Sequence, residues 1–307
     1  MRELIKDELK KQRPNIATSS LTTYTSLLKN LYDEVFKGED FDLGNFKKRE
    51  PIIEKLKTMP LNRCKTTLSA LVVLTGDNKY REMMLDKINS YNKEQSKQVK
   101  NEKQEENGVS KDEILEEFRE MKEIVNSLYK KKKLNIDDLQ TIQQYIILAL
   151  GGGMFIPPRR AEYTKMKINK IDKDKDNYIQ GNKLVFNTYK TSKFYGKQEI
   201  TMPPALRNII KKWISVNPTD YLLFDNKYNA LTNVNLNQRI NKIFGKKVGV
   251  NGLRHSYMSE KYADTIEIEK DIADDLEKMG SSLLKRKYIL RQMFKEIINI
   301  FRNNINN

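Results

Sequence analysis

The segment 138–160, "DLQTIQQYIILALGGGMFIPPRR", decides how most of the chain folds. Its first half is apolar over helical length, and a run of glycines followed by a pair of prolines then ends that helix. A helix that is apolar on most sides is buried inside a domain. The break leaves Arg159 directly after a loop, and we expect it at the start of the next helix.

The residues before this segment predict where its domain begins. Ser110 and Glu113 open the amphipathic run "SKDEILEEFREMKEIVNSLY" with the spacing of a capping box. Upstream, the stretch 91–109 has almost no apolar residue and many charges, which is typical of a solvated linker. We therefore expect a charged linker over 91–109 and a second domain over 110–307.

The N-terminal region, 1–90, predicts a small helical bundle. Between about residues 18 and 88, apolar residues recur three and four positions apart, behind a "TSSLT" that is able to cap a helix N-terminus. A second run, "LNRCKTTLSALVVLTG", ends on Gly76, as helices often do.

The residues after the glycine–proline break predict a hairpin and then more helices. Two β-type runs within 182–203, "NKLVFNTYKTSK" and "GKQEITMP", are separated by a polar turn. Over 204–307 the periodicity is helical, with breaks near Pro218, across 245–252 and near Gly280. The predicted fold class is mainly α with a small β-sheet or hairpin (α+β).

The charge of the chain favours a polyanionic partner. Lys and Arg number 57 against 41 Asp and Glu, a net charge of +16. Nucleic acid is the commonest partner of such a surface, and an anionic membrane surface is the other. No apolar run approaches the roughly 20 residues that span a bilayer, and the N-terminus has no apolar signal stretch. We expect a soluble, intracellular protein with no membrane partner.

The sequence offers little to bind a metal. Cys64 is the single cysteine and His255 the single histidine, which excludes an internal disulfide and a zinc site built from these residue types. The alternating acids of "KDKD" at 173–176 suit an exposed turn better than a magnesium site. We expect no cofactor and no metal.

Four short motifs carry the chemistry, and they follow one another in the order Arg, Lys, Arg-His, Tyr. They are "PPRRAEYTKMKINKID" after the glycine loop, "NTYKTSK" on the hairpin, "NGLRHSY" from residue 251 and "GSSLLKRKYIL" from residue 280. Their order resembles that of the tyrosine recombinase (integrase) family, whose catalytic domain also underlies the type IB topoisomerases. The resemblance covers about the last two hundred residues. The N-terminal bundle is similar to the family's DNA-clamping domain only in kind.

The resemblance implies a role for individual residues. Arg159 and Arg254 would hold the scissile phosphate of double-stranded DNA, Lys190 would protonate the leaving oxygen, and Tyr288 would be the nucleophile. Lys193 is the reserve for the lysine. The supporting positions that it implies are Glu162, Asn251, His255 and Ser281.

This chain departs from the family pattern at two histidines. Asn251 stands where the third motif usually has its first histidine. In the last motif, alignment on the glycine puts Ser281 at the histidine position, and counting back from the tyrosine puts Met279 there. An asparagine donates a hydrogen bond but is no base at neutral pH, so deprotonation through substrate or water is expected. His255 is then expected to support the neighbouring arginine.

The chemistry implied by these residues is consistent without a metal. Positive charge fixed around the non-bridging phosphate oxygens stabilises the transition state, and guanidinium groups do not lose that charge by titration. A tyrosyl oxygen forms a 3′-phosphotyrosine that conserves the bond for rejoining. A lysine on a hairpin suits the general acid.

Each motif alone is weak, and several functions stay open. Arg159 and Arg254 could be surface or structural residues. Tyr257 and Tyr262 could be core residues of the same region, and Tyr288 is favoured as the nucleophile because it lies in a basic segment past Gly280, with Tyr262 as the next candidate. The leading hypothesis is a site-specific recombinase or integrase of a virus or mobile element, since frequent Lys, Asn and Ile fit an AT-rich genome. The alternatives are a type IB topoisomerase or telomere resolvase, and a catalytically weak DNA-binding relic.

The end of the chain bears on oligomerisation. The stretch "ILRQMFKEIINIFRNNINN" has a wide apolar face at helical spacing. Such a face packs either on its own domain or on a second protomer. The resemblance implies the second case, a homo-tetramer on DNA linked through this C-terminal helix.

Overall fold

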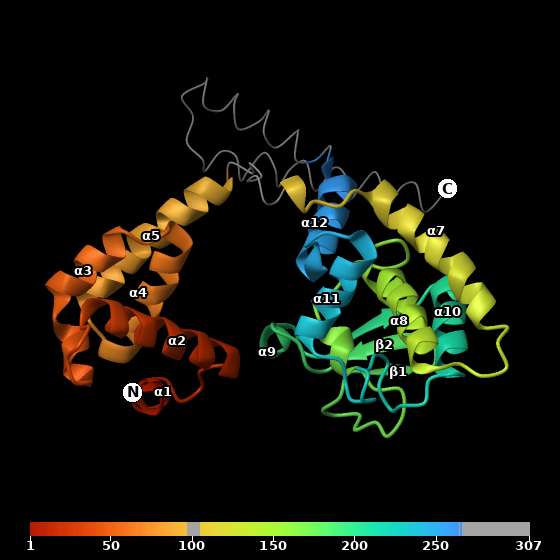
Figure 1. The fold of residues 1–307 in the computed structure, drawn as a ribbon, viewed down its shortest axis with the longest axis horizontal. Coiled ribbons are helices and arrows are strands. Elements are labelled where there is room, and N and C mark those ends of the chain that lie inside the picture. Colours follow the sequence, from red (N-terminus) through yellow and green to blue (C-terminus); the bar gives the residue numbers. More distant parts are fainter. Residues whose placement is uncertain (97–104, 264, 266–307) are drawn as a thin grey trace, which may run out of the picture. The chain divides into compact units, whose positions relative to one another are not determined.

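The computed structural model describes residues 1–96, 105–263 and 265, and the chain divides into two compact units, Met1–Asn101 and Glu102–Asn307 (Figure 1). Helices dominate both units, and one three-stranded antiparallel sheet lies in the second. The predicted fold class, mainly α with a small β-sheet, is confirmed.

The first unit is a bundle of helices. Its core lies between α1, α2, α4 and α5, and Tyr32 at its centre is 1% exposed. The Tyr32 hydroxyl donates to the Asp40 carbonyl (2.7 Å) and accepts from the Asp42 amide (3.0 Å), which fixes the loop after α2. The elements are α1 (Arg2–Gln12), α2 (Thr18–Val35), η1 (Leu43–Lys47), α3 (Arg49–Lys57), α4 (Leu61–Thr75) and α5 (Asn78–Ser96).

Two helix ends of this unit test the sequence predictions. Gly76 does end α4, in the left-handed conformation with φ +68°, and its amide bonds the Val72 carbonyl at 3.0 Å. The predicted cap by "TSSLT" is wrong, because Ala17 is the N-cap of α2 and makes no side-chain cap. Thr18 to Thr22 all lie inside the helix, where the Thr22 hydroxyl donates to the Thr18 carbonyl (3.0 Å).

The second unit is organised around helix α8. Every residue from Tyr145 to Leu150 is buried, so buried side chains lie on several sides of it, and α7, α10, α11 and α12 all contact it. The elements are α7 (Lys111–Leu128), α8 (Ile136–Gly151), η2 (Glu162–Lys165), β1 (Tyr178–Gln180), β2 (Lys183–Phe186), α9 (Ser192–Tyr195), β3 (Gln198–Thr201), α10 (Pro204–Ile214), α11 (Asn233–Phe244) and α12 (Gly249–Lys261).

The sheet has the order β1-β2-β3, with both pairs antiparallel. Strands β2 and β3 form the hairpin that the sequence predicts, and Phe186 pairs with Gln198 at the end next to the connecting segment. The connection is longer than a simple polar turn, because the strands stop at that pair and the single helical turn α9 lies between them. Lys190 therefore lies in the loop between β2 and α9.

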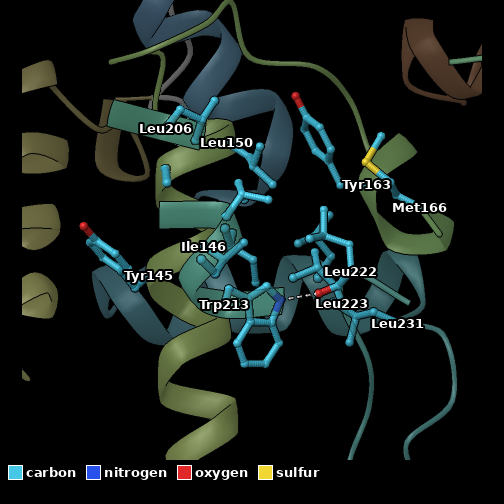
Figure 2. Close-up of a cluster of buried hydrophobic side chains, with 14 of the residues drawn as sticks. Tyr145, Ile146, Leu150, Tyr163, Met166, Leu206, Trp213, Leu222, Leu223 and Leu231 are labelled. Atoms are coloured by element: carbon cyan, nitrogen blue, oxygen red, sulfur yellow. Dashed lines mark hydrogen bonds between the residues drawn. The ribbon is translucent and has the colours of Figure 1, made fainter. Parts of the chain in front are cut away.

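Trp213 anchors the core between α10 and the segment that follows it (Figure 2). Its side chain is fully buried, its indole nitrogen donates to the Leu222 carbonyl at 2.8 Å, and its ring stacks on Phe224 with centroids 5.9 Å apart. Gln143 of α8 accepts from the Phe224 amide (2.8 Å) and from Arg239 Nη1 (3.0 Å). Burial lowers the pKa of Arg239 to about 10.

The prediction of helix over 204–307 is wrong for residues 215–232. This segment is irregular, and its backbone bridges Lys167 to Tyr221 and Phe224 to Ala230. The spacing of its buried apolar residues is compatible with a helix in the sequence. Some of their amides, however, bond other segments, as the Leu222 amide bonds the Met166 carbonyl at 2.8 Å. Tertiary contacts override helical periodicity here.

Helix α12 begins earlier than its glycines suggest. Gly249 takes a left-handed φ of +58° and starts the helix, and the Val250 amide bonds Asn237 Oδ1 at 2.9 Å. Gly252 lies inside the helix. Arg254 consequently stands in its second turn and does not open it.

The chain enters the second unit next to α12. Ser110 and Glu113 form the predicted capping box of α7, with bonds of 2.8 and 3.1 Å. Asn107 Oδ1 accepts from the Lys247 amide (2.9 Å), and Glu113 accepts from Lys246 Nζ (2.7 Å). An ion pair also joins Lys111 to Glu260 of α12. These contacts tie the start of α7 to α12 and to the loop before it.

Candidate active site

The glycine loop after α8 passes close to its neighbours, which explains its composition. A Cβ at Gly152 would lie 2.8 Å from a methyl group of Ile114. Gly153 has a φ of +80°, and a Cβ there would lie 2.6 Å from the ring of Tyr257 on α12. Only glycine fits such an approach without displacement. The loop that leads to Arg159 is thereby held against α12.

Arg159 lies in irregular backbone, and the element after it is the short 3-10 helix η2. The prediction that it starts an α-helix is wrong, because backbone bonds from Lys167 and Ile168 to Asn177 and Asp220 lead the chain away soon after η2.

The guanidinium of Arg159 is fixed by the end of the hairpin next to its connecting segment. Its Nη1 donates to Gln198 Oε1 at 2.8 Å. Its central carbon lies 4.0 Å from the ring centroid of Phe186 and 4.9 Å from that of Tyr189. Planar stacking on aromatic faces is a favoured arrangement for arginine. The sheet therefore holds this cation in one orientation.

A pocket lies between the loop that carries Arg159 and Arg160, here called the arginine loop, and the helices behind it. Arg159, Arg160 and Tyr163 form one side, and α12 contributes Val250 and Leu253. The remaining lining residues come from α8, α11 and the segment before α11; they are Ile147, Leu150, Gly151, Leu223, Leu236 and Ile240. Leu150, Leu223 and Tyr163 are labelled in Figure 2. The first and third motifs thus meet at one place.

Arg254 lies at the edge of this meeting point. It follows Leu253 directly and stands one helical turn after Val250, so it shares the α12 surface next to the pocket without lining it. Its side chain is half-buried, and no hydrogen bond or ion pair joins it to any of the residues that the structure describes.

Three buried polar atoms near Arg159 have no hydrogen-bond partner among the described residues: Arg159 Nε, Glu162 Oε2 and Tyr163 Oη. Burial raises the pKa of Tyr163, Glu162 raises it further, and Arg159 acts in the opposite direction. The phenol therefore stays neutral and keeps a proton to donate. Buried polar groups usually find partners, so a cluster of three within five residues marks a site that has bonding capacity left.

The lysine candidates lie on the loop next to this cluster. Lys190 is exposed and directly follows Tyr189, whose ring lies on Arg159. Lys193 is exposed on α9. Within the described part of the chain, neither lysine takes part in a hydrogen bond or ion pair. The structure thus brings the hairpin lysine motif to the first arginine.

The supporting candidates on α12 are solvent-exposed. Asn251 and His255 are four positions apart and share one face of the helix. No hydrogen bond joins His255 to Arg254, and its role as a support for that arginine stays a prediction. Tyr288 and Ser281, like the C-terminal helix, lie outside the described residues.

The sequence did not indicate the residues that orient Arg159. Gln198 is a polar residue at the start of a strand, and nothing in its neighbourhood marks it as the partner of an arginine 39 positions earlier. Tyr163 follows Glu162 in the first motif, but nothing in the sequence marks it as part of the site. Phe186 and Tyr189 lie within the run that predicts the hairpin. Aromatic residues are common in strands, so the sequence does not mark these two as contacts of Arg159.

Over residues 1–96, 105–263 and 265, no helix is long and apolar enough to cross a membrane. In the same ranges, no group of three or more His, Cys, Asp or Glu side chains is placed to hold a metal ion.

Comparison with known proteins gives a distant likeness to a solved structure. No family model matches the chain, and no curated protein matches it. Among solved structures, the chain is similar to one described as the crystal structure of XerA recombinase, at 12% identity and a TM-score of 0.34, over 83% of each chain. A likeness at this distance does not assign the chain to a family.

Proposed function

We propose that this chain is a DNA breaking and rejoining enzyme of the tyrosine recombinase kind. The observation that carries the proposal is the position of Arg159. Gln198 and two aromatic rings orient its guanidinium, and it lines a pocket that α12 closes one turn away from Arg254. Two arginines from distant parts of the sequence thus lie at or next to one pocket.

This arrangement suits a phosphodiester. Arg159 is a half-buried cation that no described carboxylate neutralises, and a phosphate oxygen is an acceptor for the guanidinium protons that Gln198 leaves free. Arg254 adds a second cation that no described carboxylate neutralises. Fixed positive charge of this kind stabilises the pentacoordinate transition state more than the ground state. The net charge of +16 favours binding of the polyanion as a whole.

The remaining roles follow from the resemblance in the sequence. Tyr288 attacks the phosphorus and forms a 3′-phosphotyrosine, while the 5′-oxygen leaves with a proton from Lys190. Asn251 donates a hydrogen bond to the phosphate, and Glu162 and Ser281 support the site. Rejoining is the reverse reaction with a 5′-hydroxyl as the nucleophile, so no cofactor or metal is required.

Within this class, a recombinase or integrase is the leading candidate. It requires two DNA sites and several protomers, and the apolar face of the C-terminal segment would link them in a tetramer. A type IB topoisomerase or a telomere resolvase shares the same covalent step. A recombinase and a topoisomerase differ in oligomeric state, because a topoisomerase acts as a monomer.

Capture of a covalent adduct tests the proposal. The full chain is incubated with a plasmid library of random sequence in EDTA, the reaction is stopped with detergent, and protein-linked DNA is isolated and sequenced. Captured sequences then supply a nicked substrate that traps the adduct. We expect the wild type to form the adduct, the Tyr288→Phe variant to bind DNA without forming it, and the control Tyr262→Phe to form it.

The outcomes separate the alternatives. An adduct that survives Tyr288→Phe contradicts the assignment of the nucleophile and turns attention to Tyr262, which is 39% exposed on the surface. DNA binding by the wild type with no adduct under any condition identifies the chain as a non-catalytic DNA-binding protein.

A further inference from the structure

The tip of the β2–β3 connection displays two aromatic side chains to solvent. Phe194 and Tyr195 of α9 are 86% and 70% exposed, more than any other large apolar side chain in the described residues. Single exposed apolar residues are common on protein surfaces and need no explanation. Two adjacent aromatic residues at a loop tip are different, because neither contributes to the core of the unit.

The backbone that carries this pair is ordered by its own hydrogen bonds. The amides of Phe194 and Tyr195 bond the Thr191 carbonyl at 3.0 and 3.2 Å. The turn closes at Gly196, which has a φ of +65° and accepts a 2.8 Å bond from the Tyr189 hydroxyl. The rings are therefore presented from a fixed turn and not from an irregular loop.

Positive charge flanks the aromatic pair. Lys190 and Lys193 are exposed, and no described carboxylate pairs with either. Lys197, on the other side, shares Glu199 with Lys183 at 3.1 and 2.7 Å. Aromatic rings interspersed with lysines match a ligand that combines phosphates with flat, stackable bases. An apolar protein partner would not require the lysines.

The same turn is connected to the candidate active site through one residue. The ring of Tyr189 lies 4.9 Å from the guanidinium carbon of Arg159, and its hydroxyl holds Gly196 directly after the aromatic pair. A ligand group that contacts Phe194 or Tyr195 is thus placed near the phosphate that Arg159 would bind.

We propose that Phe194 and Tyr195 stack on a nucleobase that is unpaired or displaced from its stack, close to the phosphate bound by Arg159. The preferred substrate is then DNA that is locally opened, and not a uniform intact duplex. The inference rests on the DNA-binding part of the proposed function and is independent of the covalent chemistry.

Binding to matched duplexes tests this. Fluorescence anisotropy compares the full chain on an intact duplex and on the same duplex with one bulged 2-aminopurine. Stacking supports a preference of about tenfold for the bulged duplex, and the Phe194→Ala/Tyr195→Ala variant loses it. Quenching of the 2-aminopurine by the wild type, and its absence with the variant, reports the stacking directly. Because both side chains are exposed, the variant keeps the thermal stability of the wild type.

Two control variants make the result specific. Val234→Ala removes an apolar side chain that is 65% exposed on α11, and it should keep the full preference. Lys193→Gln removes a charge from the same turn, so it should weaken binding to both duplexes equally and reduce the salt dependence.

Several results would overturn the inference. One is equal affinity of the wild type for both duplexes, and another is a preference that persists in the double alanine variant. A third is a change of oligomeric state in that variant without DNA, measured by sedimentation, together with no base preference in the wild type; the aromatic pair would then contact a second copy of the chain. If the preference is present but no covalent adduct forms, the catalytic proposal fails and this inference stands.

Discussion

Replacement of Gly153 by alanine tests the contact that joins the arginine loop to α12. The left-handed φ of +80° costs an L-residue about 1 kcal/mol. The new Cβ would also lie 2.6 Å from the ring of Tyr257, and overpacking of this kind costs roughly 1–3 kcal/mol. We therefore expect Gly153→Ala to destabilise the second unit by about 3 kcal/mol, the sum of the two effects.

The matched control is Gly245→Ala. Gly245 also has a left-handed φ, +63°, but a Cβ there would meet no atom within 4 Å. Its replacement should cost only the backbone part, about 1 kcal/mol. For a unit of this size, the melting temperature should fall by roughly 6–12 °C for Gly153→Ala and by roughly 2–4 °C for Gly245→Ala.

Differential scanning calorimetry measures both shifts, and a double-mutant cycle isolates the ring contact. In a Tyr257→Ala background, Gly153→Ala should cost about as much as the control, because only the backbone strain is left. Equal costs of Gly153→Ala and Gly245→Ala in the wild-type background would refute the reasoning, since the loop would then not press on the ring.

Two further predictions concern the orientation of Arg159 and the pH dependence of stability. Gln198→Leu removes a hydrogen bond to the Arg159 guanidinium, so adduct formation should slow by about tenfold at unchanged DNA affinity. The control Gln180→Leu on β1, at the other edge of the sheet, should have no effect. Equal losses of affinity and rate would contradict a positioning role. Hydrogen bonding from Lys246 lowers the pKa of Glu113 below 4.5, so their pairing stabilises the fold above that pH and is lost as the pH falls through the lowered value. Glu113→Gln retains the capping box and should cost less than about 1 kcal/mol near neutral pH and nothing in acid, measured by urea unfolding; a cost that persists in acid would assign it to the cap.

The sequence predicted those features that depend on neighbouring residues. The capping box at Ser110, the glycine that ends α4 and the buried helix α8 all follow from patterns a few residues long. The hairpin followed from composition in the same way. Local rules suffice where local bonds decide the structure.

The features that the sequence did not predict depend on contacts between residues far apart in the chain. Residues 215–232 are irregular because their amides bond α8 and the segment around Met166, far away in the sequence. Gln198 orients Arg159 across 39 positions of the sequence, and no pattern around either residue reveals that contact. The four motifs can be recognised because each is short, but the contacts that join the first three are long-range.

The contacts at the start of α7 have a mechanical consequence. Asn107 and Glu113 are bonded to the loop before α12, and Lys111 is paired with Glu260 on that helix itself. Tension along the chain that enters the second unit would therefore load α12 before it reaches the buried core around α8. Beyond α7 itself, the loop before α12 and the helix that carries Arg254 would be the first parts of this unit to experience a pull, so a force on the linker would change the spacing of the two arginines.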